Sequence, residues 1–533
     1  MISLLDCTLR DGGYVNDWEF GNNNLINIFE RLVDSKVDTI EVGFLDERRP
    51  FDPNRSIMPD TKSVDKIYGH LDKGSSSVIA MIDYGTCGLS NIQPCSETML
   101  DGIRVIFKKH LREPALEFCS ELKKLGYKVY AQLVSVTSYN DFELLDLIRL
   151  ANEVKPYAVS MVDTYGLMHQ NNLMHYFDML DNNLDTEIAL GYHGHNNFQM
   201  GYANCISVIN KVNYTKRNLL VDGSIYGMGK SAGNAPLELI MMHLNRLSPD
   251  RYDIGQILEA IDGTISQYYT PATWGYNLFF YVAALNNCHP NYVSFLMNKK
   301  TLSVKAITEL LGCIPEERAL LYNEQCIEDI YIKYQTNTID DSEDIGKLKD
   351  LLHGRDILLV GPGNLKGLEK KMKEYEGDGP VIITINCIRD GIDQDYIFLC
   401  NSKRYMQMTA QLSREKYAII ATSNLTKTGP NTFDYLLNYE TLLEDAPIVA
   451  DSATIMIMKI LSEMGCRSIS LAGLDGYSQK KASEFGDEEG AETISDMQEY
   501  INSYIGGVIN NIGKKTKIRY LTKSQFEKYY EEV

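Results

Sequence analysis

The chain has 533 residues, more than one domain usually contains, and we expect two or three domains. Its 52 Lys and Arg residues against 72 Asp and Glu residues give a formal net charge of −20. That charge argues against nucleic acid or an anionic membrane surface as a main partner. The 44% of hydrophobic residues is ordinary for a globular protein, and the longest apolar run, residues 278–285, is too short to cross a bilayer.

The cysteines and the N-terminus indicate the compartment. Eleven cysteines are scattered without a CxxC pair, which favours reduced thiols over a disulfide framework or a cysteine metal site. The first strand-like run starts within a few residues of Met1 and leaves no room for a signal peptide. We therefore expect a cytoplasmic protein that binds neither nucleic acid nor membranes.

Residues 1–247 alternate short β-rich runs with amphipathic helical segments. Eight strand-then-helix units of roughly 30 residues predict an α/β protein with a (β/α)₈ TIM barrel. A doubly wound sheet is the alternative, but it rarely needs eight units, and polar residues fall repeatedly at the strand ends. The expected strands are residues 2–7, 39–44, 78–83, 103–107, 129–134, 158–162, 188–193 and 219–224. The helices expected between them include residues 23–35, 111–125, 141–154 and 197–211.

The rest of the chain predicts two further parts. Residues 248–338 form a mostly helical extension with a break at His289-Pro290, and the acidic segment 340–349 has the composition of a linker. Residues 350–533 predict a smaller Rossmann-like α/β domain with a parallel sheet. Its expected strands are residues 356–360, 381–385, 396–399, 418–421 and 469–472, with a helix at 452–464.

Two distant polar segments predict a metal site. Asp11 follows the first expected strand, and His193 and His195 end the seventh. Histidines two apart on a strand point to the same face, and the carboxyl ends of barrel strands meet at one mouth, where the chemistry of such barrels sits. A histidine pair alone is as often a hydrogen-bonded structural feature as a ligand set. Together with Asp11 it predicts a divalent-metal site with positions open to substrate oxygens.

A glycine-rich segment, residues 222–234, follows the eighth expected strand. Its glycines permit close backbone approach, and Asn234 precedes Ala235-Pro236, where a helix is expected to begin. Gly229-Lys230-Ser231 suggests a Walker-type phosphate loop. The first glycine of that motif would stand at position 224, which is Ser224, so we exclude it.

Three motifs occur in one order along the first half of the chain. They are Asp6-x-Thr8-Leu9-Arg10-Asp11-Gly12, Tyr192-His193-Gly194-His195-Asn196 and Gly227-x-Gly229-(x)₃-Gly233-Asn234-Ala235-Pro236. The combination resembles the metal-dependent aldolase and lyase superfamily, which includes hydroxymethylglutaryl-CoA lyase, isopropylmalate and homocitrate synthases and 4-hydroxy-2-oxovalerate aldolase. The resemblance implies Mn²⁺ or Mg²⁺ held by Asp11, His193 and His195, with Asn234 at the same site.

Within that superfamily the chain is most similar to the hydroxy-oxoacid aldolase. The Claisen-type synthases carry acidic and amide residues where this chain has Gly13 and Tyr14, and the CoA lyase's cysteine is missing from residues 225–234. The aldolase has a helical extension whose Gly-Tyr pair reaches the barrel mouth, and Gly275-Tyr276 is similar to that pair. It also has a catalytic histidine where this chain has Tyr14, which leaves the proton-transfer group open.

The resemblance implies chemistry through the enolate of a 2-oxoacid. Arg10 would place a fixed positive charge on the developing enolate oxygen, and Glu41 at the end of the second strand would orient its guanidinium. The base is Tyr14, Tyr276, His110 after the fourth strand, or metal-bound water. Two further residues, Ser135 and Thr137, share one face of the fifth strand and are candidates for binding substrate, although ordinary solvated strand-end residues are the more common explanation for such a pattern.

The C-terminal half carries a second glycine turn. Gly361-Pro362-Gly363 follows an expected strand, as in dinucleotide-binding folds. The third glycine position holds Lys366, and Asn386 rather than an acidic residue ends the next strand, so the pattern argues against NAD.

Residues 357–365 and 453–475, together with Asn386, are similar to Rossmann-like domains of bacterial surface-polysaccharide and sialyltransferase-like proteins. This resemblance implies a nucleotide or phosphate at Gly361, Gly363 and Asn364, on a helix N-terminus. A docking or dimerisation domain without a ligand is the alternative.

The sequence therefore predicts a divalent-metal-dependent aldolase or carbon–carbon lyase that joins or cleaves pyruvate, or a related 2-oxoacid, and an aldehyde. We expect a homo-oligomer whose second domain takes a nucleotide or sugar ligand in cell-surface glycan synthesis. Two alternatives stay open. One is an acyl-CoA Claisen condensation on the same barrel, and the other is a barrel without catalysis that serves as a scaffold.

Overall fold

The computed structural model describes residues 1–215, 217–270, 273–299, 302–372, 379–409, 411–412, 416–427, 433–446, 449–477 and 488–529, the last range without the side chains of 488–497. The chain forms two compact units, one from Met1 to Pro290 and a second that begins at Asn291. No helix among the described residues has the length and apolar character needed to span a bilayer.

The first unit is a closed parallel barrel, which confirms the predicted fold. Its strands follow each other around the barrel in the order β1-β9-β8-β7-β6-β5-β4-β2, and β1 pairs with β2 to close it. The short strand β3 adds to the outer edge of β2. The barrel strands are β1 (Ile2–Asp6), β2 (Thr39–Leu45), β4 (Ser77–Asp83), β5 (Gly102–Phe107), β6 (Lys128–Leu133), β7 (Ala158–Asp163), β8 (Ala189–Gly194) and β9 (Leu219–Gly223), with β3 at Ile57–Met58.

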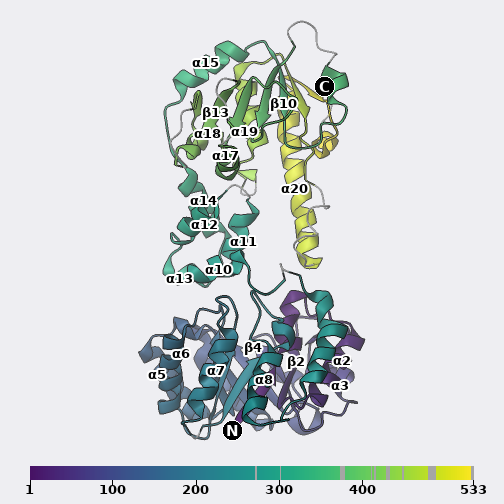
Figure 1. Ribbon diagram of the computed structural model, residues 1–533, viewed down its shortest axis with the longest axis vertical. Helices are drawn as coiled ribbons and strands as arrows, with labels where there is room; N and C mark the ends of the chain where they lie inside the picture. Colours follow the sequence, from purple (N-terminus) through teal and green to yellow (C-terminus); the bar gives the residue numbers. More distant parts are fainter. Residues whose placement is uncertain are drawn as a thin grey trace. The chain divides into compact units, whose positions relative to one another are not determined.

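Helices surround the barrel strands, as Figure 1 shows. Each turns an apolar stripe inward and buries it against the strands, whose Val, Ile and Leu side chains form one continuous core with them. These helices are α2 (Asn22–Asp34), α3 (Thr61–Tyr68), α4 (Arg112–Lys124), α5 (Asp141–Val154), α6 (Gln170–Asn183), α7 (Gly201–Val212), α8 (Leu237–Leu247) and α9 (Ile254–Ala260). The helix α10 (Leu278–Leu285) comes after them in the chain.

Helix α7 begins later than the sequence predicts, at Gly201 instead of residue 197. The preceding residues form the loop after β8, and Asn196 Oδ1 accepts a hydrogen bond from Gly201 N at 3.0 Å. Asparagine side chains bind backbone N–H groups readily, and this favours loops and helix starts over helix interiors.

The barrel interior is layered. Near the amino ends of the strands lies an apolar layer that includes Leu5, Ile79, Tyr130, Ala158, Ala189 and Leu220. One step along the strands, the interior becomes polar: Arg104 is 1% exposed and pairs with Asp222 at 2.6 Å and with Glu41 at 3.3 Å. Each of these buried charges has a partner of opposite sign, and an unpaired charge in the barrel interior would be costly.

Strand β2 carries a bulge that Gly43 makes possible. The pairing of β2 with β4 shifts register between Glu41 and Phe44, and Gly43 has a φ of +143°. A Cβ atom at position 43 would lie 1.8 Å from the carbonyl oxygen of Ser56. Gly43→Ala should therefore lower the free energy of unfolding by about 2–4 kcal/mol, from backbone strain plus overpacking.

The chain's two tryptophans, Trp18 and Trp274, both belong to the first unit, so their fluorescence during urea unfolding reports on that unit. The matched control is Gly21→Ala, because Gly21 also has a positive φ but no atom within 4 Å of its added Cβ. Gly21→Ala should lower the free energy of unfolding only by the cost of backbone strain. Equal stability losses in the two variants would contradict the packing argument.

The second unit contains a seven-stranded parallel sheet, which confirms the predicted second α/β part. Its strand order is β14-β13-β12-β11-β10-β15-β16, so the direction of succession reverses between β10 and β15. The sequence predicted five of these strands and missed the two edge strands β14 and β16. The strands are β10 (Asp356–Val360), β11 (Val381–Ile385), β12 (Tyr396–Leu399), β13 (Ala418–Thr422), β14 (Tyr435–Leu437), β15 (Ser468–Ala472) and β16 (Lys517–Tyr520).

Helices accompany this sheet as well (Figure 1). The most buried is α19 (Ala453–Met464), whose Ile, Leu and Met side chains pack into the core of the second unit. The others are α15 (Ser342–Leu352), α16 (Leu368–Met372), α17 (Ser402–Met408), α18 (Tyr439–Leu442) and α20 (Glu488–Gly513). Four further helices precede the sheet in the chain: α11 (Pro290–Asn298), α12 (Val304–Leu311), α13 (Glu316–Ala319) and α14 (Glu324–Gln335).

Candidate metal centre

Asp11, His193 and His195 meet at the carboxyl end of the barrel. Asp11 ends the single turn α1 (Thr8–Asp11) that follows β1, His193 is the penultimate residue of β8, and His195 directly follows that strand's last residue, Gly194. The two Nε2 atoms are 3.4 Å apart, and Asp11 Oδ2 lies 3.7 Å from His193 Nε2 and 4.0 Å from His195 Nε2. The three side chains are buried and offer one ligand atom each within 4.8 Å of one another.

The hydrogen bonds of the histidines define which nitrogen is free. His195 Nδ1 lies 3.1 Å from the carbonyl oxygen of Lys230, and His193 Nδ1 lies 3.1 Å from Asp222 Oδ2. Both partners accept, so each Nδ1 carries the proton and each Nε2 presents a lone pair. Two imidazole lone pairs and a carboxylate thus point at one place, an arrangement that a divalent cation would stabilise.

Charge states at the centre suit metal binding. Burial and the neighbouring His193 lower the pKa of His195 to about 4 despite the opposing effect of Asp11, so its ring is neutral at neutral pH. Burial alone would raise the pKa of Asp11, but Arg10 and the two histidines bring it well below its usual range. A neutral imidazole and an ionised carboxylate are the forms that bind metal.

Asn234 lies beside Asp11. Its Nδ2 donates to Asp11 Oδ1 at 3.1 Å and to the carbonyl oxygen of Met228 at 3.1 Å. Its Oδ1 is buried and makes no hydrogen bond within the described part of the chain. A buried amide oxygen without a partner is costly, and a cation held by the three ligands would offer it one. The residues present therefore fit a divalent metal.

Arg10 stands next to the centre, as the sequence predicts. Its Nη1 pairs with Asp11 Oδ2, and its Nε donates to Glu41 Oε2 at 2.8 Å. Trp18 Nε1 donates to the Arg10 carbonyl oxygen at 2.8 Å. Two carboxylates thus fix the guanidinium of the buried Arg10, and the expected salt bridge to Glu41 is confirmed.

The two tyrosines proposed as bases lie in different surroundings. The Tyr14 ring contacts Trp18 and the Lys230 ammonium, whose Nζ is 5.2 Å from the ring centroid. Partial burial and the Asp11 carboxylate raise the pKa of Tyr14, so its phenol keeps its proton at neutral pH. Tyr276 is 62% exposed, and its ring lies 6.5 Å from that of Tyr281.

The remaining candidates lie on the loops that follow β5 and β6. The prediction that Ser135 and Thr137 share a face of the fifth strand is wrong, because β6 ends at Leu133 and both residues lie beyond it. Ser135 has a φ of +50°, donates its backbone N–H to Thr164 Oγ1 at 2.8 Å, and hydrogen-bonds the Tyr165 hydroxyl through its side chain. Thr137 is half-buried in the 3₁₀ turn Val136–Ser138. His110 is exposed on the turn Lys109–Leu111 after β5.

A model of the HMGL-like family matches residues 1–262. Residues 1–262 belong to the HMGL-like family. The 4-hydroxy-2-oxovalerate aldolase 6 of Rhodococcus jostii is 22% identical over 270 residues, which are 50% of this chain and 74% of that protein. The 2-isopropylmalate synthase of Saccharolobus solfataricus is 26% identical over 250 residues, which are 46% of this chain and 63% of that protein.

Among solved structures, the HMG-CoA lyase of Bacillus subtilis covers 50% of this chain and 93% of its own, with 16% identity and a TM-score of 0.41. Aldolases of the HMGL-like family depend on a divalent metal, and the Asp11, His193 and His195 cluster is consistent with such a site.

Sequence analysis did not identify two buried carboxylates that lie near the candidate metal ligands. Asp222 at the end of β9 contacts both His193 and Arg104. Burial alone would raise the pKa of Asp222, but these two partners outweigh burial and lower it. Asp163 at the end of β7 accepts from the backbone of Leu167 and Met168. The position of these two aspartates at strand ends was the one signal in the sequence that could have indicated them. The sequence does not show which side chains they meet, because those come from distant segments.

Asp222→Asn should lower the affinity of the barrel for Mn²⁺ about 10–100-fold, because the carboxylate that fixes the tautomer and orientation of His193 is lost. Mn²⁺ titration by electron paramagnetic resonance measures the change. Asp141→Asn is the matched control, since Asp141 also pairs with a histidine, His175, at 2.8 Å but on the exposed surface. An unchanged Mn²⁺ affinity in Asp222→Asn would contradict the orienting role.

In the second unit, Gly361, Gly363 and Asn364 form the turn after β10. A Cβ at Gly361 would lie 2.5 Å from the carbonyl oxygen of Gly473, and one at Gly363 would lie 2.5 Å from Asp475 Cγ. Asn364 N donates to both carboxylate oxygens of Asp475, at 3.1 and 2.9 Å. The glycines therefore let the turns after β10 and β15 pack against each other, which is a structural reason for this pattern.

Asn386, the fourth residue predicted for this ligand, follows β11 with a φ of +51°. Its Oδ1 accepts from Cys400 N at 3.1 Å, and its own N donates to the carbonyl oxygen of Phe398 at 2.8 Å. These bonds join the carboxyl ends of β11 and β12.

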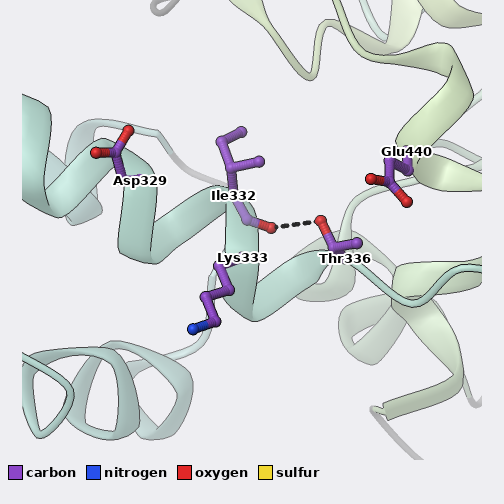
Figure 2. A pocket seen from close by; sticks show the side chains of 5 residues that line it. All are labelled: Asp329, Ile332, Lys333, Thr336 and Glu440. Carbon is purple, nitrogen blue, oxygen red and sulfur yellow. Dashed lines mark hydrogen bonds between the residues drawn. The ribbon is translucent and has the colours of Figure 1, made fainter.

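A surface hollow also lies on the second unit, between α14 and α18. Figure 2 shows the carboxylates of Asp329 and Glu440 at opposite ends of it, with Lys333 pointing away from both. Thr336 Oγ1 donates to the carbonyl oxygen of Ile332 at 2.9 Å. The polar groups do not converge on one point, and we assign no chemistry to this hollow.

Proposed function

We propose that the barrel forms or cleaves a carbon–carbon bond through the enolate of pyruvate or a related 2-oxoacid, with an aldehyde as the second substrate and Mn²⁺ or Mg²⁺ as the cofactor. The observation that carries this proposal is the convergence of two imidazole lone pairs and one carboxylate beside a buried, doubly paired guanidinium. The aldolases among the relatives support the same reaction class.

The chain's own groups have clear tasks in this reaction. A divalent cation held by Asp11, His193 and His195 would supply Lewis-acid stabilisation of the negative charge that develops on the 2-oxoacid. Arg10 would add a second positive charge at a fixed position, because Glu41 and Asp11 restrain its guanidinium. Because the guanidinium of Arg10 is already held in position, it does not need to reorient when the negative charge develops on the 2-oxoacid.

The test is the exchange of pyruvate methyl protons for deuterium, followed by NMR with the full chain and Mn²⁺ or Mg²⁺. Enolate formation predicts exchange that a chelator stops and added metal restores. Exchange no faster than in metal-containing buffer, for pyruvate and for longer 2-oxoacids, would contradict the proposal.

A Claisen condensation with an acyl-CoA is the second candidate, and the similarity to a 2-isopropylmalate synthase favours keeping it. The two reactions differ in what they consume. Release of free CoA thiol from acetyl-CoA in the presence of a 2-oxoacid would select the condensation, whereas consumption of an aldehyde without CoA selects the aldol reaction.

For the second unit we propose a nucleotide or sugar-derived ligand at the carboxyl edge of its sheet, with a role in cell-surface glycan synthesis. The support is topological: the strand order reverses between β10 and β15, and open α/β sheets bind ligands at such a switch point. Protection of the full chain against thermal unfolding by nucleotide sugars, and its loss in Asn364→Ala, would test this.

A further inference from the structure

The segment that follows the barrel returns to the barrel mouth at several points. Gly275 N donates to the carbonyl oxygen of Ala232 at 3.2 Å, and Trp274 Nε1 donates to the carbonyl oxygen of Tyr226 at 3.0 Å. Both acceptors lie in the glycine-rich loop after β9. Further along the segment, the ring of Tyr281 lies 6.2 Å from that of Phe198 in the loop after β8.

His289, near the end of this segment, contacts one of the loops at the barrel mouth. Its ring stands edge-on to Tyr165, in the loop after β7, with the centroids 5.9 Å apart. It also experiences the charge of Lys230, in the loop after β9. Strand β8, which carries His193 and ends one residue before His195, lies between β7 and β9, so Tyr165 and Lys230 belong to the loops on either side of its carboxyl end.

The imidazole of His289 is in the form that accepts a proton. Burial and the Lys230 ammonium lower its pKa to about 4, so the ring is neutral at neutral pH. An anionic 2-oxoacid in the mouth would bring a negative charge near this ring and raise its pKa toward neutrality. A base whose pKa approaches the working pH transfers protons efficiently.

The other candidate bases fit this task less well. Tyr14 keeps its proton, because a phenol has an ordinary pKa of about 10 and its surroundings raise that pKa further. Tyr276 and His110 are both exposed. Tyr165, which touches His289, hydrogen-bonds Ser135, and burial raises its pKa to about 12.

We propose that His289 is the proton-transfer group of the barrel, in an inference that rests on the proposed function. Its ring nitrogen takes a proton from the methyl carbon of the 2-oxoacid, and the C–H electron pair becomes the carbon–carbon double bond of the enolate. The enolate carbon then bonds to the aldehyde carbon. The imidazolium returns its proton to the aldehyde oxygen, so the histidine is restored and no oxidant or reductant is needed.

The experiment compares pyruvate methyl exchange in the full chain with Mn²⁺ for the wild type, His289→Ala and His169→Ala. His169 is the matched control, because it also lies in a loop at this mouth and stacks on an aromatic ring, that of Phe198 at 5.3 Å. His289→Ala should exchange about 10²–10⁴-fold more slowly with unchanged Mn²⁺ affinity, and free imidazole should restore part of the rate. His169→Ala should keep the wild-type rate.

Imidazole rescue separates proton transfer from a purely structural role, since an added base cannot repair misplaced loops. A wild-type rate in His289→Ala, or a loss that imidazole leaves unchanged in folded protein, overturns the assignment while the proposed function stands. If the alanine variant does not fold, His289→Gln is used, and it must lose exchange at least 10-fold to support the assignment. Absence of metal-dependent exchange in the wild type would overturn the proposed function itself, and this assignment with it.

Discussion

Replacing Asp11 with asparagine is expected to reduce metal-dependent exchange of pyruvate protons to the rate of buffer containing Mn²⁺ alone. Asp11 supplies the one anionic ligand atom of the three-residue cluster, and a neutral amide cannot offset the charge of a divalent cation beside Arg10. The NMR exchange assay measures the loss, and metal analysis of the purified variant should find no bound Mn²⁺.

The fold should survive this substitution. Arg10 keeps its bond to Glu41, and the barrel core does not involve Asp11. Asp46→Asn is the matched control, because Asp46 follows β2 at the same end of the barrel but binds Arg48, and it should exchange at the wild-type rate. His195→Ala should reproduce the loss seen in Asp11→Asn.

The same measurements address the scaffold alternative. A barrel without catalysis has no need of a metal, so wild-type protein that retains no Mn²⁺ and shows no exchange would favour it. Full exchange activity in Asp11→Asn, by contrast, would refute the metal assignment while leaving an enzyme.

Much of the fold could be predicted because strands buried on both faces have continuous apolar sequences. β10, β11 and β12 begin and end where the sequence predicts, at Asp356–Val360, Val381–Ile385 and Tyr396–Leu399. The two missed strands, β14 and β16, lie at the sheet's edges. β16, with the sequence Lys-Ile-Arg-Tyr, has a single fully apolar residue between charged ones, and such short mixed runs resemble loops.

The metal cluster could also be predicted, since the two histidines stand at the carboxyl end of β8 and Asp11 stands in the turn after β1. What supports the cluster could not. Arg104 interrupts the apolar run of β5, and its partners Glu41 and Asp222 stand 63 and 118 residues away in the sequence. Nothing local in the sequence indicates which of many strand-end carboxylates a buried arginine meets. The sequence around His289 predicted only a break between helices, because Tyr165 and Lys230, which lie in other loops, become relevant to it only in the folded barrel.

Replacing Arg104 with methionine is expected to lower the free energy of unfolding of the barrel by about 3–5 kcal/mol at pH 7, because removing one partner leaves buried carboxylates uncompensated. Arg104 pairs with Glu41 and Asp222 and donates to Gln132 Oε1 at 2.7 Å. Urea unfolding followed by tryptophan fluorescence measures the free energy of unfolding of the first unit. Arg149→Met is the control, since Arg149 is an exposed surface residue, and it should change stability by less than about 1 kcal/mol.

The stability loss should depend on pH. In the wild type, Arg104 and His193 hold the pKa of Asp222 below its usual value. A lowered carboxyl pKa contributes stability above the unfolded-state value of about 3.9, and that stability is lost as the pH falls through the folded-state pKa. Arg104→Met removes this contribution, so the gap between variant and wild type should shrink on acidification.

Arg104 also links the two halves of the metal centre, because Glu41 holds Arg10 and Asp222 holds His193. We therefore expect Arg104→Met to weaken Mn²⁺ binding as well as stability. In the double variant Arg104→Met/Asp222→Asn, one uncompensated charge is gone. Its loss of stability should therefore be smaller than the sum of the two single-variant losses by about 0.5–3 kcal/mol. Strictly additive losses would show that the two side chains stabilise the barrel independently of each other.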